Sequence, residues 1–200
     1  MRVSAFNEKT AEKLYNEIIK FEINPLNDIE SYILDLRRNP GGLLSQAIEV
    51  SNMFINQGLI VSTKRPRFDK IISEYEAKRG DLISGKPLIV LVNGGSASAS
   101  EIVAGALQDN NRAIILGTKT FGKGSVQTVM PIPGDGAMRL TTARYYTPSG
   151  RSIQALGVSP DIIVEQPRQA PKEDDGEEDS SRPARSEADL RGSLDNDSLS

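Results

Sequence analysis

The stretch NGGSASASEIVAGALQDNNRAIILGTKTFGKGSVQ, residues 93–127, decides the fold predicted for this chain of 200 residues. It follows an apolar strand, PLIVLV at residues 87–92, and opens with a turn of glycines and serines. A helical pattern comes next, then a second apolar strand and a second glycine-rich turn that carries Lys123. Strand, tight turn and helix are the usual setting of a serine nucleophile held at a helix N-terminus. The stretch therefore predicts an α/β fold with a candidate serine at the end of a strand.

The composition limits which group could activate such a serine. The chain has no histidine and no cysteine, which excludes a Ser-His-Asp triad, a cysteine protease and a thiolate or imidazole metal site. The base would have to be Lys, Asp, Glu or Tyr. Lysine is a known alternative, because a desolvated ammonium group can lose its proton near neutral pH. No cofactor is expected.

Towards the N-terminus, helical and strand patterns alternate. Apolar residues at helical spacing predict helices at residues 10–21 and 43–56. Residues 2–6 predict a short strand, and SYILDL at residues 31–36 predicts a buried strand that ends in the turn RRNPGG. This alternation predicts a layered α/β domain with parallel core strands flanked by helices. The NPGG and GGSASAS turns would follow neighbouring strands, at the edge where sites gather in such folds.

After Lys123 the pattern becomes that of strands. Residues 125–133 and 137–147 flank the turn GDG and predict a β-hairpin. The charged residues 68–80 predict an excursion or a short hairpin over the sheet. Residues 165–200 contain eleven acidic and five basic residues and almost no large apolar ones. They cannot bury enough surface to offset their ordering entropy, so they predict a disordered linker or tail.

The first glycine-serine turn carries three alternating serines, Ser96, Ser98 and Ser100, which cannot all have one role. With Glu101 three residues later, Ser98 also fits a capping box, in which the serine only satisfies a helix N–H group. The residues of this turn, taken alone, leave a nucleophile and a helix cap as alternatives.

The second turn places Lys123 between two glycines and close to Phe121. Small neighbours let the backbone approach closely, and the phenyl ring could desolvate the amine. The alternative is a solvated lysine in a turn. The preceding residues match the first part of a phosphate loop, but Gly124 stands where that motif needs Ser or Thr, and the lysine leads into a strand. Nucleotide binding is therefore not expected, and dispersed basic residues give no support for nucleic-acid binding.

The glycine pair Gly41-Gly42, after Asn39-Pro40, also allows two interpretations. It could form only a tight turn at the entry to a helix. It could in addition supply a backbone N–H group that binds an oxyanion.

Together these features resemble a known family, the C-terminal processing peptidases or tail-specific proteases, which are serine proteases with a Ser/Lys dyad. The motifs that carry the resemblance are DLRRNPGGLL at residues 35–44, VNGGSASASEIVAGALQD at 92–109, GTKTFGKGSVQ at 117–127 and RYYTPSGRSIQALGVSPDI at 144–162. They stand in the family's order and spacing. The resemblance implies a crotonase/Clp-protease-like core at residues 1–164, with a β-hairpin after the lysine, and an acidic linker or tail at 165–200.

The resemblance also assigns roles to individual residues. The family's nucleophile falls on Ser98 and its general base on Lys123. The glutamine that orients the lysine falls on Gln127, which at lysine plus four in a strand would share a face with Lys123. Asp109 matches an acidic position to which we give a supporting role.

The oxyanion hole implied by the resemblance has two backbone donors. One is the Ala99 N–H group, and the other is a glycine N–H group of the NPGG turn, either Gly42 or Gly41. The reaction would be acyl transfer, in which neutral Lys123 takes the proton from Ser98 and later gives it to the leaving amine.

By resemblance, the substrate would be a protein or peptide entered from its C-terminus, and the location the bacterial cell envelope or periplasm. Membrane proximity of the parent protein and homo-oligomerisation are left open. Family members usually carry a PDZ domain before the core, whereas here the family-like sequence starts at Arg2. We therefore expect a fragment that holds the protease core. The alternatives are a non-catalytic binding module for apolar ligands or protein C-termini, and a core that is inactive without its PDZ domain.

Overall fold

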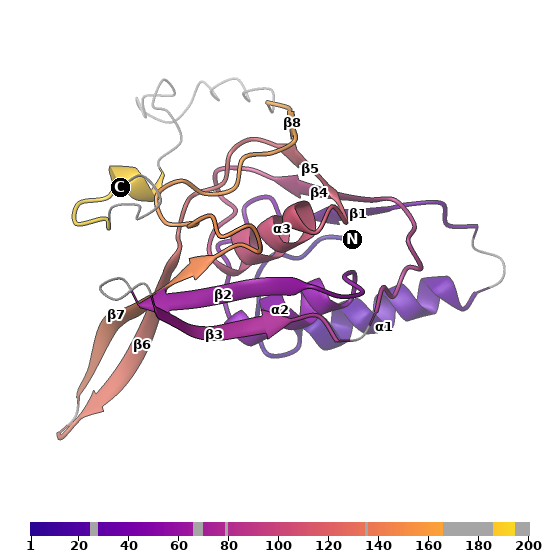
Figure 1. Ribbon diagram of the computed structural model, residues 1–200. Helices are drawn as coiled ribbons and strands as arrows, with labels where there is room; N and C mark the ends of the chain where they lie inside the picture. Colours follow the sequence, from indigo (N-terminus) through magenta and orange to yellow (C-terminus); the bar gives the residue numbers. More distant parts are fainter. Residues whose placement is uncertain (25–27, 66–69, 79, 135, 166–185, 195–200) are drawn as a thin grey trace, which may run out of the picture.

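The computed structural model describes the whole chain except residues 25–27, 66–69, 79, 135, 166–185 and 195–200. Two sheets enclose a helical layer in the described part of the chain (Figure 1). Helix α3 contacts β5 of one sheet and β2 of the other, and α2 packs between α3 and α1. The predicted layered α/β architecture is confirmed, and a second sheet adds a layer to it.

The first sheet is parallel and has the strand order β1-β4-β5-β8. Its strands are β1 (Tyr32–Asp35), β4 (Leu88–Val92), β5 (Ile114–Gly117) and β8 (Ile162–Ile163). In register, Asp35 pairs with Leu91, and Val92 pairs with Gly117. Since β1 and β4 are direct neighbours, the two glycine-containing turns that follow them lie at the same edge of the sheet, as predicted.

Three helices cover this sheet in the described residues: α1 (Thr10–Glu22), α2 (Leu44–Asn52) and α3 (Ala99–Asp109). Every residue of α3 from Ala99 to Leu107 is buried. A helix that is buried all round needs cover on both sides, which explains its place between the sheets. Helix α2 ends earlier than the predicted residue 56, because the chain leaves the helix to bury Phe54 and Ile55 in the core.

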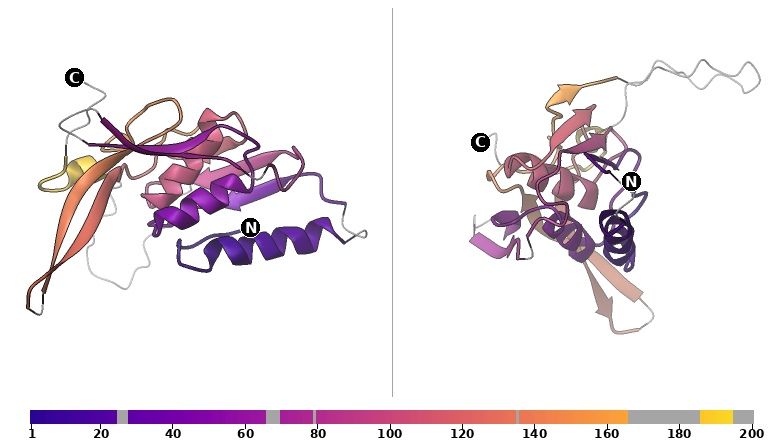
Figure 2. Two further views of the ribbon diagram at one scale, coloured as in Figure 1. Left: turned by 60° about the horizontal axis from the view of Figure 1, so that its bottom comes forward. Right: turned by 90° about the vertical axis from the view of Figure 1, so that its right-hand side faces the viewer.

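The second sheet is antiparallel, with the order β3-β2-β7-β6. Its strands are β2 (Leu59–Arg65), β3 (Lys70–Glu76), β6 (Ser125–Ile132) and β7 (Gly136–Tyr146). The predicted hairpin forms as β6 and β7, and its tip projects away from the body of the protein (Figure 2). The expected excursion contains β3, which pairs with β2.

The N-terminal segment is less regular than predicted. Residues 2–6 form isolated parallel bridges, Arg2 with Asp35 and Phe6 with Gly42, and no continuous strand. The Val3 N–H donates to the Asp35 carbonyl at 3.0 Å and the Phe6 N–H to Gly41 at 2.9 Å. This segment therefore follows the edge of β1 and the turn after it, and touches them at its two ends.

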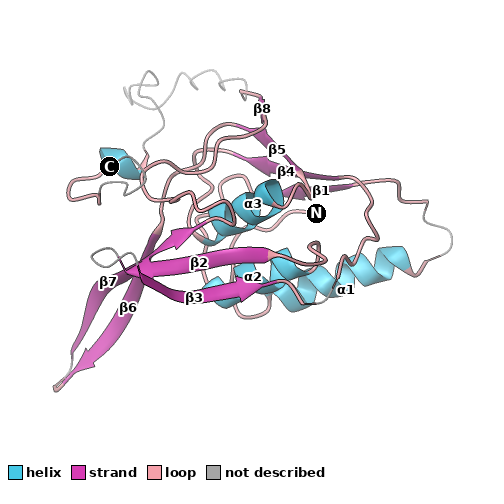
Figure 3. Ribbon diagram, viewed as in Figure 1, coloured by secondary structure: helices cyan, strands magenta, loops and turns pink. Residues whose placement is uncertain are grey.

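Part of the segment predicted to be a disordered tail is described and differs from that expectation. A 3-10 helix, η1 (Glu187–Asp189), is drawn as the short helix near the C-terminus (Figure 3). Its first turn is closed locally by the Asp189 carboxylate, which accepts the Ser186 N–H at 2.8 Å. The Glu187 N–H donates to the Phe121 carbonyl at 2.9 Å, which fastens the segment to the lysine turn. Residues 166–185 and 195–200 lie outside the described residues. No helix of the described chain is long and apolar enough to cross a membrane.

Candidate active site

Three turns meet at the carboxyl edge of the parallel sheet, after β1, β4 and β5 (Figure 1). The nucleophile turn, which we define as residues 93–98, is bound to the NPGG turn by the Ala97 N–H, which donates to the Asn39 carbonyl at 3.0 Å. The lysine turn, residues 120–124, is bound to the nucleophile turn by the Phe121 N–H, which donates to the Ser96 carbonyl at 3.0 Å. Segments that are far apart in the sequence thus form one cluster of backbone.

The structure gives the three alternating serines different environments. Ser96 and Ser100 are fully buried, and their hydroxyls donate to the carbonyls of Leu36 at 2.8 Å and Asn39 at 2.9 Å. Both therefore anchor the nucleophile turn to the end of β1. Ser98 is the partly exposed member of the three.

Ser98 has an unusual backbone conformation, with φ 55° and ψ −113°. A residue other than glycine in such a region costs on the order of 1–3 kcal/mol and persists only where its surroundings hold it. The anchors on both sides of Ser98 supply that restraint. The capping box expected from Ser98 and Glu101 is also present, so a helix-capping role and a nucleophile role are compatible at this residue.

The two glycines of the NPGG turn are not equivalent. The Gly41 N–H donates to the Asn39 side-chain oxygen at 2.9 Å. For the N–H groups of Gly42 and Ala99, no acceptor is found within the described residues. Gly41 has φ +97°, and a Cβ on it would lie 2.8 Å from the Ala99 nitrogen and 2.8 Å from the Ser98 Cβ. The turn therefore lies directly against the nucleophile, with the Gly42 N–H free to donate.

The glycines that flank Lys123 allow close approach of the backbone, as the sequence predicted. A Cβ on Gly124 would lie 2.3 Å from the Gln154 nitrogen, and one on Gly122 would lie 3.0 Å from the Ala155 carbonyl carbon. The buried Gln154 side chain accepts the Gly124 N–H at 3.2 Å. Sequence reasoning missed Gln154, because its position in a motif gave no sign that it would meet the lysine turn.

Glu101 also has contacts that its sequence position did not reveal. Its Oε2 atom accepts the N–H groups of both Ser98 and Lys123, each at 2.8 Å. The two backbone nitrogens therefore lie no more than 5.6 Å apart, twice that distance. Burial raises the pKa of this carboxyl above its usual range, although the hydrogen bonds from Thr120, Gly122, Ser98 and Lys123 act in the opposite direction. The capping-box spacing was the one signal that pointed to it.

The other two predicted site residues lie apart from this cluster. Gln127 is in β6 and is exposed, and the described residues show no hydrogen bond between it and Lys123; its orienting role stays a prediction. Asp109 is at the far end of α3, roughly 15 Å along the helix axis from Ser98 at 1.5 Å per residue. Its carboxylate accepts the Ser149 N–H at 2.9 Å and pairs with Arg151. Its supporting role would therefore act through the turn at residues 147–151.

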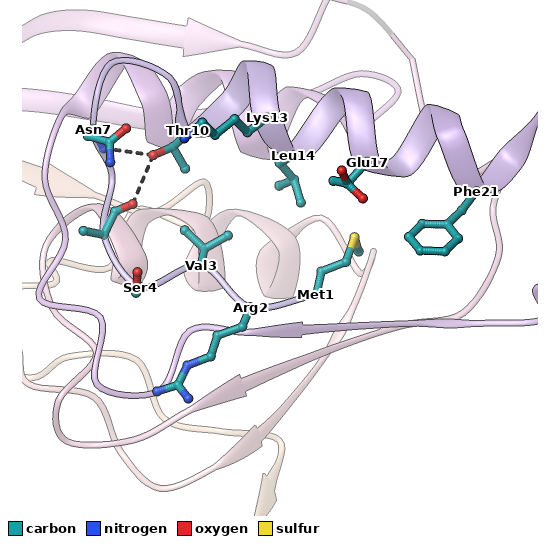
Figure 4. A pocket seen from close by; sticks show the side chains of 11 residues that line it. Met1, Arg2, Val3, Ser4, Asn7, Thr10, Lys13, Leu14, Glu17 and Phe21 are labelled. Carbon is teal, nitrogen blue, oxygen red and sulfur yellow. Dashed lines mark hydrogen bonds between the residues drawn. The ribbon is translucent and has the colours of Figure 1, made fainter.

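Two hollows lie near the N-terminal segment. One, of about 570 Å³, is lined by Gly42 and Leu43 together with Phe6, and so opens beside the candidate oxyanion donor. The other, of about 560 Å³, lies between the N-terminal segment and α1, where Val3 and Leu14 form apolar walls (Figure 4). Neither Ser98 nor Lys123 lines the second hollow. Of these two hollows the one beside Gly42 adjoins a residue of the candidate site, although Ser98 and Lys123 do not line it.

An ion pair supports the turn that carries the glycine pair. The Arg37 guanidinium donates to both carboxylate oxygens of Asp35, at 2.9 and 2.8 Å. The side-chain hydrogen bonds from Arg37 hold the pKa of Asp35 below its usual range, against the opposing effect of burial, and the Arg37 N–H and the charge of Arg2 lower it further. The pair therefore links the end of β1 to the first residue of the turn.

This pair predicts an acid-sensitive contribution to stability. Because the Asp35 pKa is lower in the folded than in the unfolded chain, its contribution is complete above the unfolded value of about 3.9 and is lost as the pH falls through the folded value. Asp35→Asn should lower the free energy of unfolding at neutral pH by about 0.2–1 kcal/mol, the range for partly exposed pairs. Urea unfolding at several pH values should show this difference shrinking in acid. Glu17→Gln, at an exposed pair with Lys20, is the control and should leave the free energy of unfolding unchanged. If the effect of Asp35→Asn did not depend on pH, the lowered pKa of Asp35 would not be its cause.

Known proteins share much of this sequence. Residues 1–164 match the family described as peptidase family S41. A carboxy-terminal-processing protease of Bartonella bacilliformis is 58% identical over 168 residues, which cover 84% of this chain and 38% of that protein. A chloroplastic carboxyl-terminal-processing peptidase of Arabidopsis thaliana is 38% identical over 164 residues, which cover 81% of this chain and 30% of that protein.

A solved structure of a C-terminal processing protease has a similar fold. The solved structure of a photosystem II D1 C-terminal processing protease matches with a TM-score of 0.76 and 36% identity, covering 82% of this chain and 41% of that one. The chain thus spans less than half the length of these relatives. With the family match over residues 1–164, this chain belongs to peptidase family S41.

Proposed function

We propose that this chain forms the catalytic core of a serine endopeptidase that cleaves protein substrates at or near their C-terminus. The observation that carries the proposal is the geometry of the two turns: the partly exposed Ser98 and Lys123 have their backbone N–H groups on the same carboxylate oxygen. The C-terminal preference is supported by the names of the relatives, which are C-terminal processing proteases. A location in the bacterial cell envelope is part of the same proposal.

In the proposed mechanism, neutral Lys123 removes the proton from the Ser98 hydroxyl, and the Ser98 oxygen attacks the substrate carbonyl. The N–H groups of Ala99 and Gly42 donate to the oxyanion, and the N-terminal end of α3 adds favourable electrostatics there. The lysine then protonates the leaving amine, and water hydrolyses the acyl-enzyme. Gly42 is preferred over Gly41 as the second donor, because the Gly41 N–H already donates to Asn39.

The nucleophile is tested by covalent labelling of the full-length protein with a fluorophosphonate probe, followed by mass spectrometry of the labelled peptide. Labelling is expected at Ser98 and should be lost in Ser98→Ala. Ser100→Ala is the matched control, since its hydroxyl is buried and bonded to a carbonyl. This variant should lose about 1 kcal/mol of stability and keep the label.

The cleavage reaction is tested on an unstructured protein such as casein, by mass spectrometry of the products. Products that depend on Ser98 support the proposal, and trimming from the C-terminal end supports the preference. A protein that takes the probe at Ser98 without cutting any chain would instead act as a binding module. Cleavage that survives Ser98→Ala would show that a different residue is the nucleophile.

A further inference from the structure

Glu101 is the most completely enclosed charged side chain near the candidate site. It has no solvent exposure, although it lies at the start of α3, only three residues after Ser98. A buried carboxylate is costly unless hydrogen bonds replace its water. Four donors do so here, two on each oxygen. They are the Thr120 hydroxyl at 2.5 Å and the Gly122 N–H at 2.7 Å on Oε1, and the Ser98 and Lys123 N–H groups at 2.8 Å on Oε2.

An ionised carboxylate can accept all four of these donors. A carboxylate offers about four acceptor positions and no donor. Three of its partners are backbone N–H groups, which can only donate. The fourth, the Thr120 hydroxyl, accepts the Val158 N–H at 2.7 Å and has its own proton available for Glu101. A protonated acid could direct its hydrogen only at the Thr120 oxygen, which has a second lone pair, and the bonds from the Ser98 and Lys123 N–H groups to Oε2 would remain.

The bonds to Oε2 join two turns that are 25 residues apart in the sequence (123 − 98 = 25). A single acceptor atom thus sets the distance between the backbone of Ser98 and the backbone of Lys123. Within the described residues a further direct link between these turns, from the Phe121 N–H to the Ser96 carbonyl, lies two residues away in sequence from both Ser98 and Lys123. The carboxylate is therefore the closest connection between the nucleophile and the base.

We infer that Glu101 is a positioning residue, which as a carboxylate holds the Ser98 and Lys123 turns in the register that proton transfer requires. The inference rests on the proposed function, because it assigns Glu101 to the same dyad. Displacing a catalytic pair by about 1 Å can cost on the order of 100-fold in rate. A residue that served only the stability of the core would instead change the amount of folded protein and leave the rate per folded molecule unchanged.

The discriminating variant is Glu101→Gln in the full-length protein. Glutamine keeps the size of the side chain but replaces one acceptor oxygen with an NH₂ group, and the Ser98 and Lys123 N–H groups lose their acceptor only when the NH₂ group stands at the Oε2 position. Glu101→Leu, which has a similar size and removes both acceptor oxygens, is therefore the second variant. We expect kcat and the rate of fluorophosphonate labelling at Ser98 to fall on the order of 100-fold per folded molecule, with KM nearly unchanged. Circular dichroism and thermal unfolding give the folded fraction at the assay temperature.

Thr120→Val is the matched control. It removes one donor to Oε1 and an acceptor for the Val158 N–H, so it should destabilise the protein, but it leaves both bonds to Oε2. Its kcat per folded molecule should stay within a few-fold of the wild type. Full activity per folded molecule in Glu101→Leu would overturn the inference. An equal loss of kcat in Thr120→Val would also overturn it, since the effect would then follow general damage to the core.

A second measurement separates this inference from the proposed function. Amide hydrogen exchange at Ser98 and Lys123 reports the two bonds to Oε2 without any need for catalysis. If the wild type fails to take the probe, the proposed chemistry is wrong, and faster exchange at both amides in Glu101→Leu would still show that Glu101 fixes the two turns. If the wild type takes the probe and both amides keep their protection in Glu101→Leu, the dyad stands and the positioning role is rejected.

Discussion

Lys123→Ala is expected to abolish peptide-bond cleavage while the protein stays folded. The side chain of Lys123 is partly exposed, and the bonds that shape its turn belong to the backbone: its own N–H donates to Glu101, and the Gly124 carbonyl accepts the Tyr145 N–H at 2.8 Å. Alanine retains these bonds. In the proposed mechanism the amine takes the proton from Ser98, and removal of a general base typically costs on the order of 10²–10⁴-fold in rate.

The measurement is kcat/KM on an unstructured protein, together with a melting curve that should match the wild type closely. Lys119→Ala is the control, because Lys119 is an exposed lysine in the same connection after β5. Near-normal activity of Lys123→Ala would rule out the dyad.

Gly41→Ala is expected to have the second large effect, on both the nucleophile and stability. The added Cβ would lie 2.6 Å from the Ala97 carbonyl oxygen and 2.8 Å from the Ala99 nitrogen. Both atoms belong to backbone and cannot move independently of Ser98. The φ of +97° adds strain on the order of 1–3 kcal/mol for any residue with a Cβ. We expect at least a 100-fold loss of activity per folded molecule, because the nucleophile turn has to shift.

Gly134→Ala is the control that separates the effect of backbone strain at positive φ from the effect of the steric clash between the new Cβ and the nucleophile turn. Gly134 has φ +102°, close to that of Gly41, but a Cβ there would meet nothing within 4 Å. This variant should lose stability to a similar extent from the backbone conformation and keep its rate of Ser98 labelling. Equal labelling by both alanine variants would show that the NPGG turn does not determine the position of Ser98.

The sequence predicted those features of the fold that local patterns determine. Apolar runs located β1 and β4, and helical spacing located α1, because burial of one face sets its period. The positions of the turns followed from Gly, Pro and Ser at the ends of these strands. Since parallel neighbours bring their carboxyl ends to one edge, even the proximity of the NPGG turn and the nucleophile turn was predictable.

Contacts between distant segments could not be predicted in this way. No periodicity shows that Gln154 packs on Gly124, or that the Glu101 carboxylate accepts the Lys123 N–H. The preference for Gly42 over Gly41 depended on the direction of one N–H group, which Asn39 sets. The segment around Ser186 is a further structure that composition could not predict. Its composition favours disorder, but a few local hydrogen bonds hold it in a 3-10 helix.

Several hydrogen bonds to the lysine turn come from residues that follow it in the sequence and are therefore synthesised later. Its bonds reach forward along the chain to Tyr145, to Gln154 and to Val158. A growing polypeptide that ends just after Lys123 has the upstream partners Glu101 and Ser96 but lacks these downstream ones. The three downstream bonds are complete only when Val158, thirty-five residues beyond Lys123, has been synthesised (158 − 123 = 35). The proposed nucleophile and base are therefore both present in a nascent chain before the lysine turn has all of its partners.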